Sequence, residues 1–216
     1  MRKKLTDYRH AVWDWNGTLL DDTWLCCESL NRILEQDGHP LVDPVRYRQI
    51  FRFPVIKVYQ SLGLTPDEAS FRTMSHRFVS AYEERKAECR LHPHTERLID
   101  GLTAAGLTHS VLSAYERNLL VATLGHYGLD RHFIKMCGGD DIHAGSKEAR
   151  ARLHLGDLGL RPDEVLYFGD TDHDAEAAAA MGVDCVLTAH GHQHRERLEG
   201  LGVRVVDGFA ELVAEL

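Results

Sequence analysis

Six short apolar runs, each followed by turn residues, recur along the 216-residue chain and constrain its fold more than any other feature. Most of the stretches between them repeat apolar residues with helical periodicity. Alternating strands and helices are typical of a mostly parallel sheet with helices on both faces. We therefore predict an α/β fold with a Rossmann-like, three-layer core. The predicted strands lie in HAVWDW, THSVLSA, FIKMCGG, EVLYFGD, VDCVLTA and VRVVDG.

The alternation is interrupted between about Asp22 and His92, where no run is convincing as a strand. Helix-like segments separated by Gly and Pro fill this region instead. The simplest interpretation is an all-helical insertion after the first strand. We expect a core of residues 1–20 and 91–216 and a helical cap of residues 21–90. The helix-like segments are TWLCCESLNRILEQDG, DPVRYRQIF and PDEASFRTMSHRFVSAYEERKAE.

Composition excludes several classes of partner. The formal net charge is −8, so no basic surface for nucleic acid is indicated. No stretch approaches the roughly 18 apolar residues that a membrane span needs, and the basic N-terminus has no apolar segment behind it. The five cysteines form no CxxC pair and are odd in number, which indicates reduced thiols. We expect a cytoplasmic protein, monomeric or homodimeric, without nucleic-acid or membrane partners.

Polar residues follow several of the predicted strands at the point where each strand ends. The first strand ends on Asp14, the second on Ser113 and the fourth on Gly169-Asp170, while Lys147 opens the helix that leads into the fourth. In open parallel sheets, ligands bind beyond the carboxyl ends of the strands. Carboxylates, a hydroxyl and an ammonium gathered there predict a site for a phosphate and a divalent metal.

Each of these features also has a simpler explanation. The Asn16-Gly17 pair is a strong hairpin signal, Ser113 is typical of a turn, and Lys147 is typical of a solvated first turn. The run DTDHDAE suits a helix N-terminus. An EF-hand loop is excluded because Ala175 and Met181 stand where Gly and Glu are required. The occurrence of all the features together, in this order, favours the catalytic interpretation.

The histidine-rich segment HGHQH, His190 to His194, suggests a metal at first sight. It lacks the cysteine or carboxylate partners and the HExxH spacing of zinc sites. We therefore predict an ordinary polar loop after a strand.

The segments DWNGT, LSA, GSK and GDTDHD, in this order, resemble the four motifs of the haloacid dehalogenase superfamily. The helical insertion resembles the C1-type cap of its phosphoglycolate-phosphatase-like branch. The resemblance covers essentially the whole chain. It implies Mg²⁺-dependent hydrolysis of a phosphomonoester, with a small phosphorylated metabolite as the partner.

The resemblance also implies roles for single residues. Asp14 is expected to be the nucleophile that forms an aspartyl-phosphate. Its second oxygen, the backbone carbonyl of Asn16 and Asp170 are expected to hold Mg²⁺. Ser113 and Lys147 are expected to bind the phosphoryl oxygens.

Three further residues receive supporting roles from the same resemblance. Asp174 is expected at the metal site, where it supports the metal or Lys147, and Asp172 shares that duty. Thr18 and the backbone N–H groups around Trp15 and Asn16 are expected to complete the phosphate cradle.

The chain departs from the family pattern at Asn16. Phosphatases of this superfamily carry a second aspartate there, which protonates the leaving alcohol and then activates water. An amide has no proton to exchange near neutral pH, and losing general acid–base catalysis typically slows a reaction by about 10²–10⁴-fold. A dehalogenase needs no such acid, but the acidic cluster Asp170–Asp174 has no role in that chemistry.

Three interpretations stay open. In the first, the chain is a slow phosphatase, one tuned to good leaving groups such as acyl phosphates, or one in which a histidine replaces the acid. In the second, it resembles phosphonoacetaldehyde hydrolase and uses Lys57 of the cap as a Schiff base. In the third, it binds phosphate ligands with little turnover.

The cap segment FRFPVIK is the candidate for contact with the substrate. Arg52 and Lys57 are predicted to pair with an anionic group remote from the phosphoryl, which indicates a small acidic phosphoester. Tyr115, just after Ser113, is expected to face the same cleft.

Overall fold

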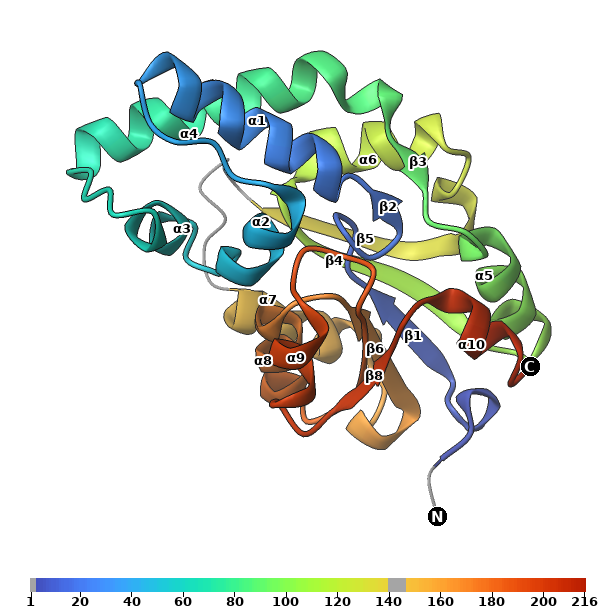
Figure 1. Cartoon of the computed structure of the whole chain (residues 1–216). Helices are drawn as coiled ribbons and strands as arrows, with labels where there is room; N and C mark the ends of the chain where they lie inside the picture. Colours follow the sequence, from blue (N-terminus) through green and yellow to red (C-terminus); the bar gives the residue numbers. More distant parts are fainter. Residues whose placement is uncertain (1–2, 140–146) are drawn as a thin grey trace.

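The computed structural model describes residues 3–139 and 147–216, and Gly145-Ser146 of the GSK segment lies outside this range. Six strands, one in each predicted run, form a single sheet in the order β5-β4-β1-β6-β7-β8 (Figure 1). Neighbouring strands of this sheet are parallel, so the predicted α/β fold is confirmed. The strands are β1 (His10–Trp13), β4 (Thr108–Glu116), β5 (Phe133–Gly139), β6 (Val165–Gly169), β7 (Asp184–Thr188) and β8 (Arg204–Val206).

Strand β1 lies at the centre of the sheet and is buried along its whole length. Trp13, its last residue, pairs with Val111 of β4 and Phe168 of β6, and its ring stacks on that of Phe168 with centroids 4.1 Å apart. This parallel register brings the carboxyl ends of the three strands to one edge of the sheet. Asp14 follows β1 directly at that edge.

Helices cover both faces of the sheet, because alternate residues of β1 enter two different cores. Ala11 and Trp13 belong to a cluster that includes residues of α5, α6 and α10. Val12 belongs to a second cluster with residues of α7 and α8. The core helices are α5 (Thr95–Ala104), α6 (Arg117–His126), α7 (Lys147–Leu158), α8 (Asp172–Met181), α9 (Arg195–Glu199) and α10 (Phe209–Val213).

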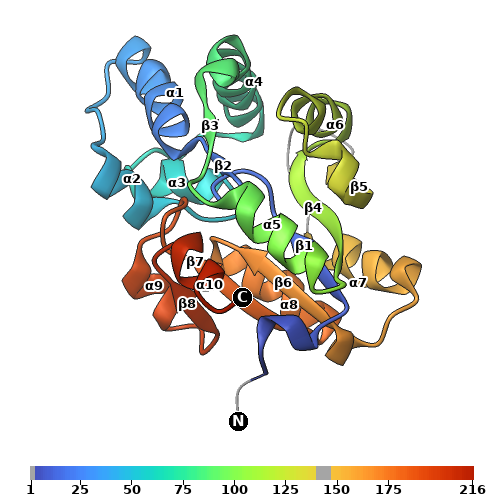
Figure 2. The ribbon, with the colours of Figure 1, turned by 90° about the vertical axis from the view of Figure 1, so that its right-hand side faces the viewer.

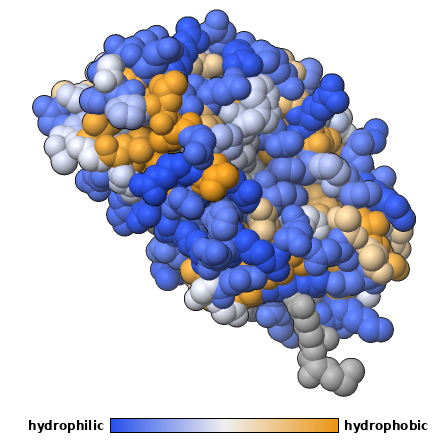
Figure 3. All heavy atoms as spheres, in the orientation of Figure 1, coloured by the Kyte–Doolittle hydropathy of each residue, from blue (hydrophilic) through white to orange (hydrophobic). Residues whose placement is uncertain are grey.

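Four helices between β1 and β4 form a group beyond the carboxyl ends of the strands (Figures 1 and 2). They are α1 (Thr23–Gln36), α2 (Pro44–Ile50), α3 (Ile56–Ser61) and α4 (Glu68–Arg85). Asp43 and Asp67 cap α2 and α4, each accepting from the backbone N–H three residues later. Helix α3 was not predicted, because six residues are too few to show a helical period. Apolar atoms gather on the surface of this group around α1, α2 and α3 (Figure 3).

A two-stranded ribbon connects the helical insertion to the core. Strands β2 (Leu20–Asp21) and β3 (Arg90–Leu91) pair antiparallel where the chain leaves and re-enters the core. Strands of two residues carry no periodicity, so the sequence did not predict them. The remaining short elements are single-turn 3₁₀ helices at Leu5–Asp7, Lys86–Glu88, Asp130–His132 and Pro162–Glu164.

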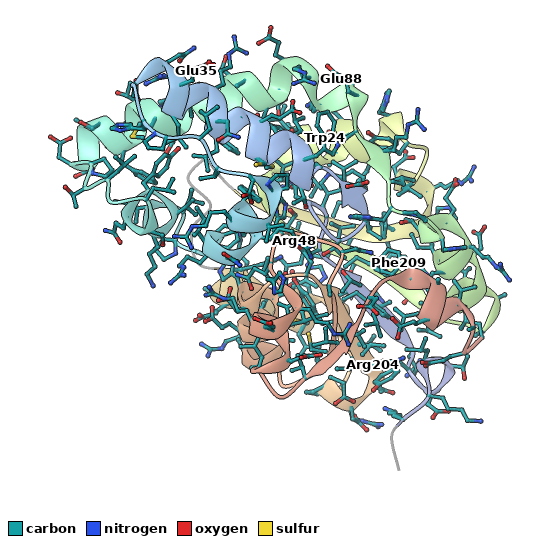
Figure 4. All side chains as sticks on the ribbon, viewed as in Figure 1. Trp24, Glu35, Arg48, Glu88, Arg204 and Phe209 are labelled. Atoms are coloured by element: carbon teal, nitrogen blue, oxygen red, sulfur yellow. The ribbon has the colours of Figure 1, made fainter. Side chains whose placement is uncertain are left out.

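A second connection joins α2 to the loop after β7. Arg48 lies between the insertion and the core (Figure 4), and its guanidinium donates to the carbonyl oxygens of Ala189 and, at 3.2 Å, Gln193. The side-chain amide of Gln193 donates back to the carbonyl of Phe51 at 3.1 Å. The insertion is therefore tied to the core at a point far from its own chain ends.

The structure also shows the state of the cysteines and the apolar character of the helices. All five cysteines lie in the described residues and are free thiols. Within residues 3–139 and 147–216, no helix is both long and apolar enough to cross a membrane.

Candidate active site

The residues predicted at the strand ends lie together in the structure. The Nζ of Lys147 lies 2.5 Å from Oδ1 of Asp14 and 2.6 Å from Oδ1 of Asp174, and all three residues are buried. Asp14, Lys147 and Ser113 also line one cavity between the sheet edge and the insertion. The parallel register thus brings these predicted residues close together.

The site carries an excess of buried negative charge. Carboxylate oxygens of Asp14, Asp170 and Asp174 lie within 4.8 Å of one another, and the ammonium of Lys147 is the cation between them. Burial raises the pKa of Asp14 and of Asp170 above the ordinary value, although Lys147 opposes this at Asp14. Three buried carboxylates against one ammonium suit an added divalent cation, which prefers oxygen ligands.

Asp174 holds Lys147 in place. Its Oδ1 accepts from Lys147, and its Oδ2 accepts from the hydroxyl of Thr171 at 2.7 Å and from the backbone N–H groups of Thr171 and Asp170 at 3.0 and 3.2 Å. Burial alone would raise the pKa of Asp174, but Lys147 holds it below the usual range. Of the two roles expected for Asp174, this geometry favours support of Lys147, because both oxygens are already engaged.

Asp170 is oriented from behind by two donors. The hydroxyl of Thr18 donates to its Oδ1 at 2.7 Å, and the backbone N–H of His192 donates to its Oδ2 at 2.6 Å. Thr18 is fully buried and is not among the described residues that line the cavity. The predicted contact of Thr18 with a phosphate is therefore corrected, because the hydroxyl of Thr18 donates to Asp170 and orients that carboxylate.

Gly17 lets the turn after β1 pass close to Asp170. Its φ is +74°, and a Cβ at this position would lie 2.4 Å from Oδ2 of Asp170. Both the left-handed backbone and the close approach require glycine here.

Asn16 is fixed by a buried carboxylate that the sequence analysis had not assigned. Its Nδ2 donates to Oδ2 of Asp22 at 2.6 Å and to the hydroxyl of Tyr82 at 3.0 Å, while that hydroxyl donates to Oδ2 of Asp22 at 2.7 Å. The backbone N–H of Gly17 donates to Oδ1 of Asp22 at 2.8 Å. Burial would raise the pKa of Asp22, but His192, Asn16 and Tyr82 together hold it below the usual range. An ionised carboxylate at this place needs donors around it, and the amide is one of them.

His192 brings the predicted polar loop into the site. Its Nε2 lies 3.5 Å from Oδ1 of Asp22, its Nδ1 lies 3.1 Å from the hydroxyl of Tyr47, and its ring stacks on Phe51 with centroids 4.6 Å apart. Asp22, Cys26 and His192 also place ligand-type atoms within 4.8 Å of one another. Because Asp22 already accepts from several donors, we describe this group as a hydrogen-bonded cluster.

Sequence reasoning missed Asp22, Tyr82 and His192. Asp22 could have been considered from the sequence, because the acidic pair Asp21-Asp22 comes only a few residues after the first motif, DWNGT. Tyr82 comes from α4 and His192 from a loop, and no sequence pattern links either of them to Asn16.

Asp172 does not take the predicted role of supporting the metal site or Lys147. Its Oδ1 accepts from the amide of Gln193 at 2.7 Å, and its Oδ2 pairs with Arg197 of α9 at 2.5 Å. Both carboxylate oxygens of Asp172 are thus engaged by Gln193 and Arg197, and Asp172 is not among the clustered carboxylates Asp14, Asp170 and Asp174, so its predicted role at the metal site is corrected.

The cap segment reaches the cavity with its apolar residues. Phe51, Phe53 and Val55 line it, whereas neither Arg52 nor Lys57 is among the described lining residues. Lys57 is exposed because α3 buries Val58 and Tyr59 on its other side. The predicted substrate contacts of Arg52 and Lys57 are corrected, and a Schiff base on Lys57 has no support in this geometry.

Tyr115 does line the cavity, as expected. Its hydroxyl contacts Glu83 and lies 3.3 Å from Nζ of Lys86. The ring of Tyr115, which belongs to the core, thus forms part of the cavity wall beneath the insertion.

Comparison of the sequence with known families gives one match over most of the chain. The family described as haloacid dehalogenase-like hydrolase matches residues 11–188. A phosphoglycolate phosphatase of Pectobacterium atrosepticum is 26% identical over 97% of this chain and 93% of that protein. The tyrosine-protein kinase PtkA of Mycobacterium tuberculosis is 25% identical over 94% of this chain and 69% of that protein.

Comparison of the fold with solved structures agrees. A haloacid dehalogenase-like family hydrolase from Streptococcus pneumoniae superimposes with a TM-score of 0.83 at 16% identity, covering 97% of this chain and 98% of that one. At this identity the likeness concerns the fold alone.

Proposed function

Because this chain belongs to the haloacid dehalogenase-like hydrolase family, we propose that it hydrolyses a phosphomonoester through an aspartyl-phosphate on Asp14. The observation that carries the proposal is the 2.5 Å contact between Asp14 and Lys147 at a cavity that Ser113 also lines. A carboxylate nucleophile, an ammonium and a hydroxyl at one place suit phosphoryl transfer. Relatives named phosphoglycolate phosphatase support the same reaction class.

In this proposal Asp14 attacks phosphorus with a carboxylate oxygen. Lys147 and Ser113 bind the phosphoryl oxygens and stabilise the charge that spreads over them in the transition state. Asp174 keeps the ammonium of Lys147 aimed at Asp14, because it accepts from the same Nζ at 2.6 Å. Water then releases phosphate and restores the carboxylate.

We include Mg²⁺ as the cofactor. Asp14, Asp170 and the backbone carbonyl of Asn16 would hold it, and the excess negative charge of the buried carboxylates fits a divalent cation. When bound, the ion offsets the charge of the phosphoryl group and keeps Asp14 ionised.

Residues 21–90 act in this proposal as a cap that closes over the site and excludes water. The β2–β3 ribbon and the Arg48 contacts are the connections across which it would move. We further propose a cytoplasmic protein, since all five of its cysteines are free thiols.

The test is chemical trapping of the intermediate. The purified chain with Mg²⁺ and a phosphoester, quenched in acid, should yield a phosphoryl adduct on the peptide that contains Asp14. The Asp14→Asn variant should give neither adduct nor phosphate release. Phosphate release without any adduct on Asp14 in the wild type would overturn the proposed intermediate.

A further inference from the structure

The cavity at the catalytic residues is apolar and aromatic over most of its wall. It has a volume of about 200 Å³. A cavity of about 150 Å³ lined by apolar side chains is large enough to bind benzene, so this space can hold an aromatic ring. Its aromatic walls include Phe51, Phe53, Tyr59, Phe71, Phe78 and Tyr82.

Among its described residues, the cavity lining holds no free cation for a second anionic group on the substrate. The two histidines of the lining are engaged, since Nε2 of His192 lies 3.5 Å from Asp22 and Nε2 of His173 accepts from the backbone N–H of Lys147 at 3.3 Å. Among the described residues that line it, no arginine occurs and Lys147 is the one lysine, which is already paired with Asp14 and Asp174. Residues 140–146 contain neither arginine nor lysine. Two acids, Glu83 and Glu116, also belong to the lining, where Glu83 pairs with Lys86 at 2.6 Å and Glu116 caps α6, so neither adds a positive charge to the wall. The walls therefore favour a neutral, apolar substituent on the phosphate.

The amide at position 16 separately restricts the leaving group. Asn16 cannot donate a proton, and the protic groups nearest to it are directed elsewhere. Tyr82 donates to Asp22, while the two ring nitrogens of His192 face Asp22 and Tyr47. A leaving oxygen at this site therefore departs without a proton from Asn16, Tyr82 or His192. Phenols, with a pKa of about 10, leave as anions far more readily than alcohols, whose acidity is close to that of water at about 15.7.

From these two observations we infer that the substrate is an aryl phosphate monoester, with the ring in the apolar cavity and its phosphate at Asp14 and Lys147. The inference rests on the proposed function and adds the substrate class to it. It differs from the small acidic phosphoester that the sequence of the cap segment had indicated.

The reaction balances without an acid at position 16. Asp14 forms a bond to phosphorus, the bond between phosphorus and the aryl oxygen breaks, and the aryloxide leaves with the electron pair. Water then forms a bond to phosphorus while the bond to Asp14 breaks, which regenerates the carboxylate. The proton that this water releases equals the one that the aryloxide takes from solvent, giving a phenol and hydrogen phosphate.

The test compares four substrates with the full-length wild type and Mg²⁺, following inorganic phosphate. Phenyl phosphate and benzyl phosphate carry the same ring but leave as a phenoxide and an alkoxide. Acetyl phosphate has a good leaving group and no ring, and 2-phosphoglycolate is small and acidic. We expect kcat/KM for phenyl phosphate to exceed that for benzyl phosphate by about 100-fold or more, since general acid catalysis is worth 10²–10⁴-fold.

Each result separates the inference from the proposed function. Equal rates for the phenyl and benzyl esters, or a preference for 2-phosphoglycolate, would overturn the aryl inference and leave the phosphatase proposal standing. Phosphate release from none of the four substrates would overturn the proposed function itself.

A variant of the cavity wall tests where the ring binds. Phe78→Ala should raise KM for phenyl phosphate about tenfold more than it raises KM for acetyl phosphate, since acetyl phosphate has no ring to place there. Phe78→Leu, which retains an apolar side chain, should lie between Phe78→Ala and wild type. An unchanged KM for phenyl phosphate in both variants would place the ring elsewhere and overturn the inference.

Discussion

The side-chain amide of Asn16 donates to the buried carboxylate of Asp22, with Nδ2 2.6 Å from Oδ2. This contact gives a physical reason for the amide at a position where family phosphatases carry an acid. Asp22 is ionised and enclosed, so a neighbour that donates stabilises it and a neighbour that is itself ionised repels it.

We therefore expect Asn16→Asp alone to give little increase in phosphatase activity. It would place two carboxylates in contact, so one of them must bind a proton or move, and the free energy of unfolding should fall by about 1–3 kcal/mol. Turnover of benzyl phosphate should change by less than tenfold. Urea unfolding and phosphate release measure the two effects.

The double variant Asn16→Asp/Asp22→Asn is the matched control, because it exchanges donor and acceptor between the two positions. It should recover stability and increase the turnover of benzyl phosphate by about 10²–10⁴-fold, the usual contribution of a general acid. If the single variant is as fast and as stable as the double variant, Asp22 does not account for the amide.

Lys147→Met should abolish measurable phosphate release and strongly destabilise the fold. The change removes the cation from two buried carboxylates, Asp14 and Asp174, and breaking a buried ion pair by removing one partner costs about 3–5 kcal/mol. Lys135→Met, which removes the more exposed pair with Asp157, is the control and should leave the midpoint of urea unfolding nearly unchanged. Equal destabilisation by the two substitutions would show that the buried pairing contributes little.

Mg²⁺ should stabilise the protein in the absence of substrate. At 100 times the dissociation constant a ligand adds about 2.7 kcal/mol, which differential scanning fluorimetry detects as a higher Tm. Asp170→Asn should lose this shift. Asp172→Asn should keep it, because Asp172 pairs with Arg197. A shift that persists in Asp170→Asn would place the ion elsewhere.

The stability that three buried histidines contribute should fall as the pH drops from about 6.5 towards 4. Burial lowers the pKa of His10 to about 3 and those of His109 and His154 to about 4, so these residues stay neutral in the folded chain. In the unfolded chain each binds a proton below pH 6.5. The stability that they contribute is therefore complete above pH 6.5 and is lost at about 1.4 kcal/mol per pH unit for each histidine below it.

Urea unfolding at pH 7, 6 and 5 measures this slope. His154→Gln keeps a hydrogen-bonding side chain next to Ser110 but does not titrate, so it should reduce the slope. His126→Gln changes an exposed histidine and should leave the slope unchanged. Identical slopes in the two variants would contradict the assignment of acid sensitivity to buried histidines.

The sequence predicted the strands well because a central parallel strand must be apolar on both sides. Val12 and Trp13 face opposite cores and are both buried, and this leaves a continuous apolar run in the sequence. The short β2–β3 ribbon and α3 left no such pattern, because two or six residues are too few to define a period.

The candidate site also contains residues that the sequence groups and residues that only the packed structure brings together. Asp14, Ser113 and Asp170 could be grouped in advance, because the carboxyl ends of parallel strands must meet at one edge. The environment of Asn16 could not, since Asp22, Tyr82 and His192 come from three separate parts of the chain. Lys57 was misplaced for a related reason, because which side of α3 faces the cavity depends on its packing. Arg52 lies in the loop before α3, where its Nε donates to the carbonyl of Ile50, and no sequence pattern shows the direction of a loop side chain.

Local patterns thus determined the fold, the position of Asp14 at the end of a strand and the presence of an amide two residues after it. The tertiary structure decided what surrounds that amide and which side chains line the cavity. Burial and contact across elements are properties of the packed chain, because the electric field and the shape at one residue are set by side chains distant in sequence.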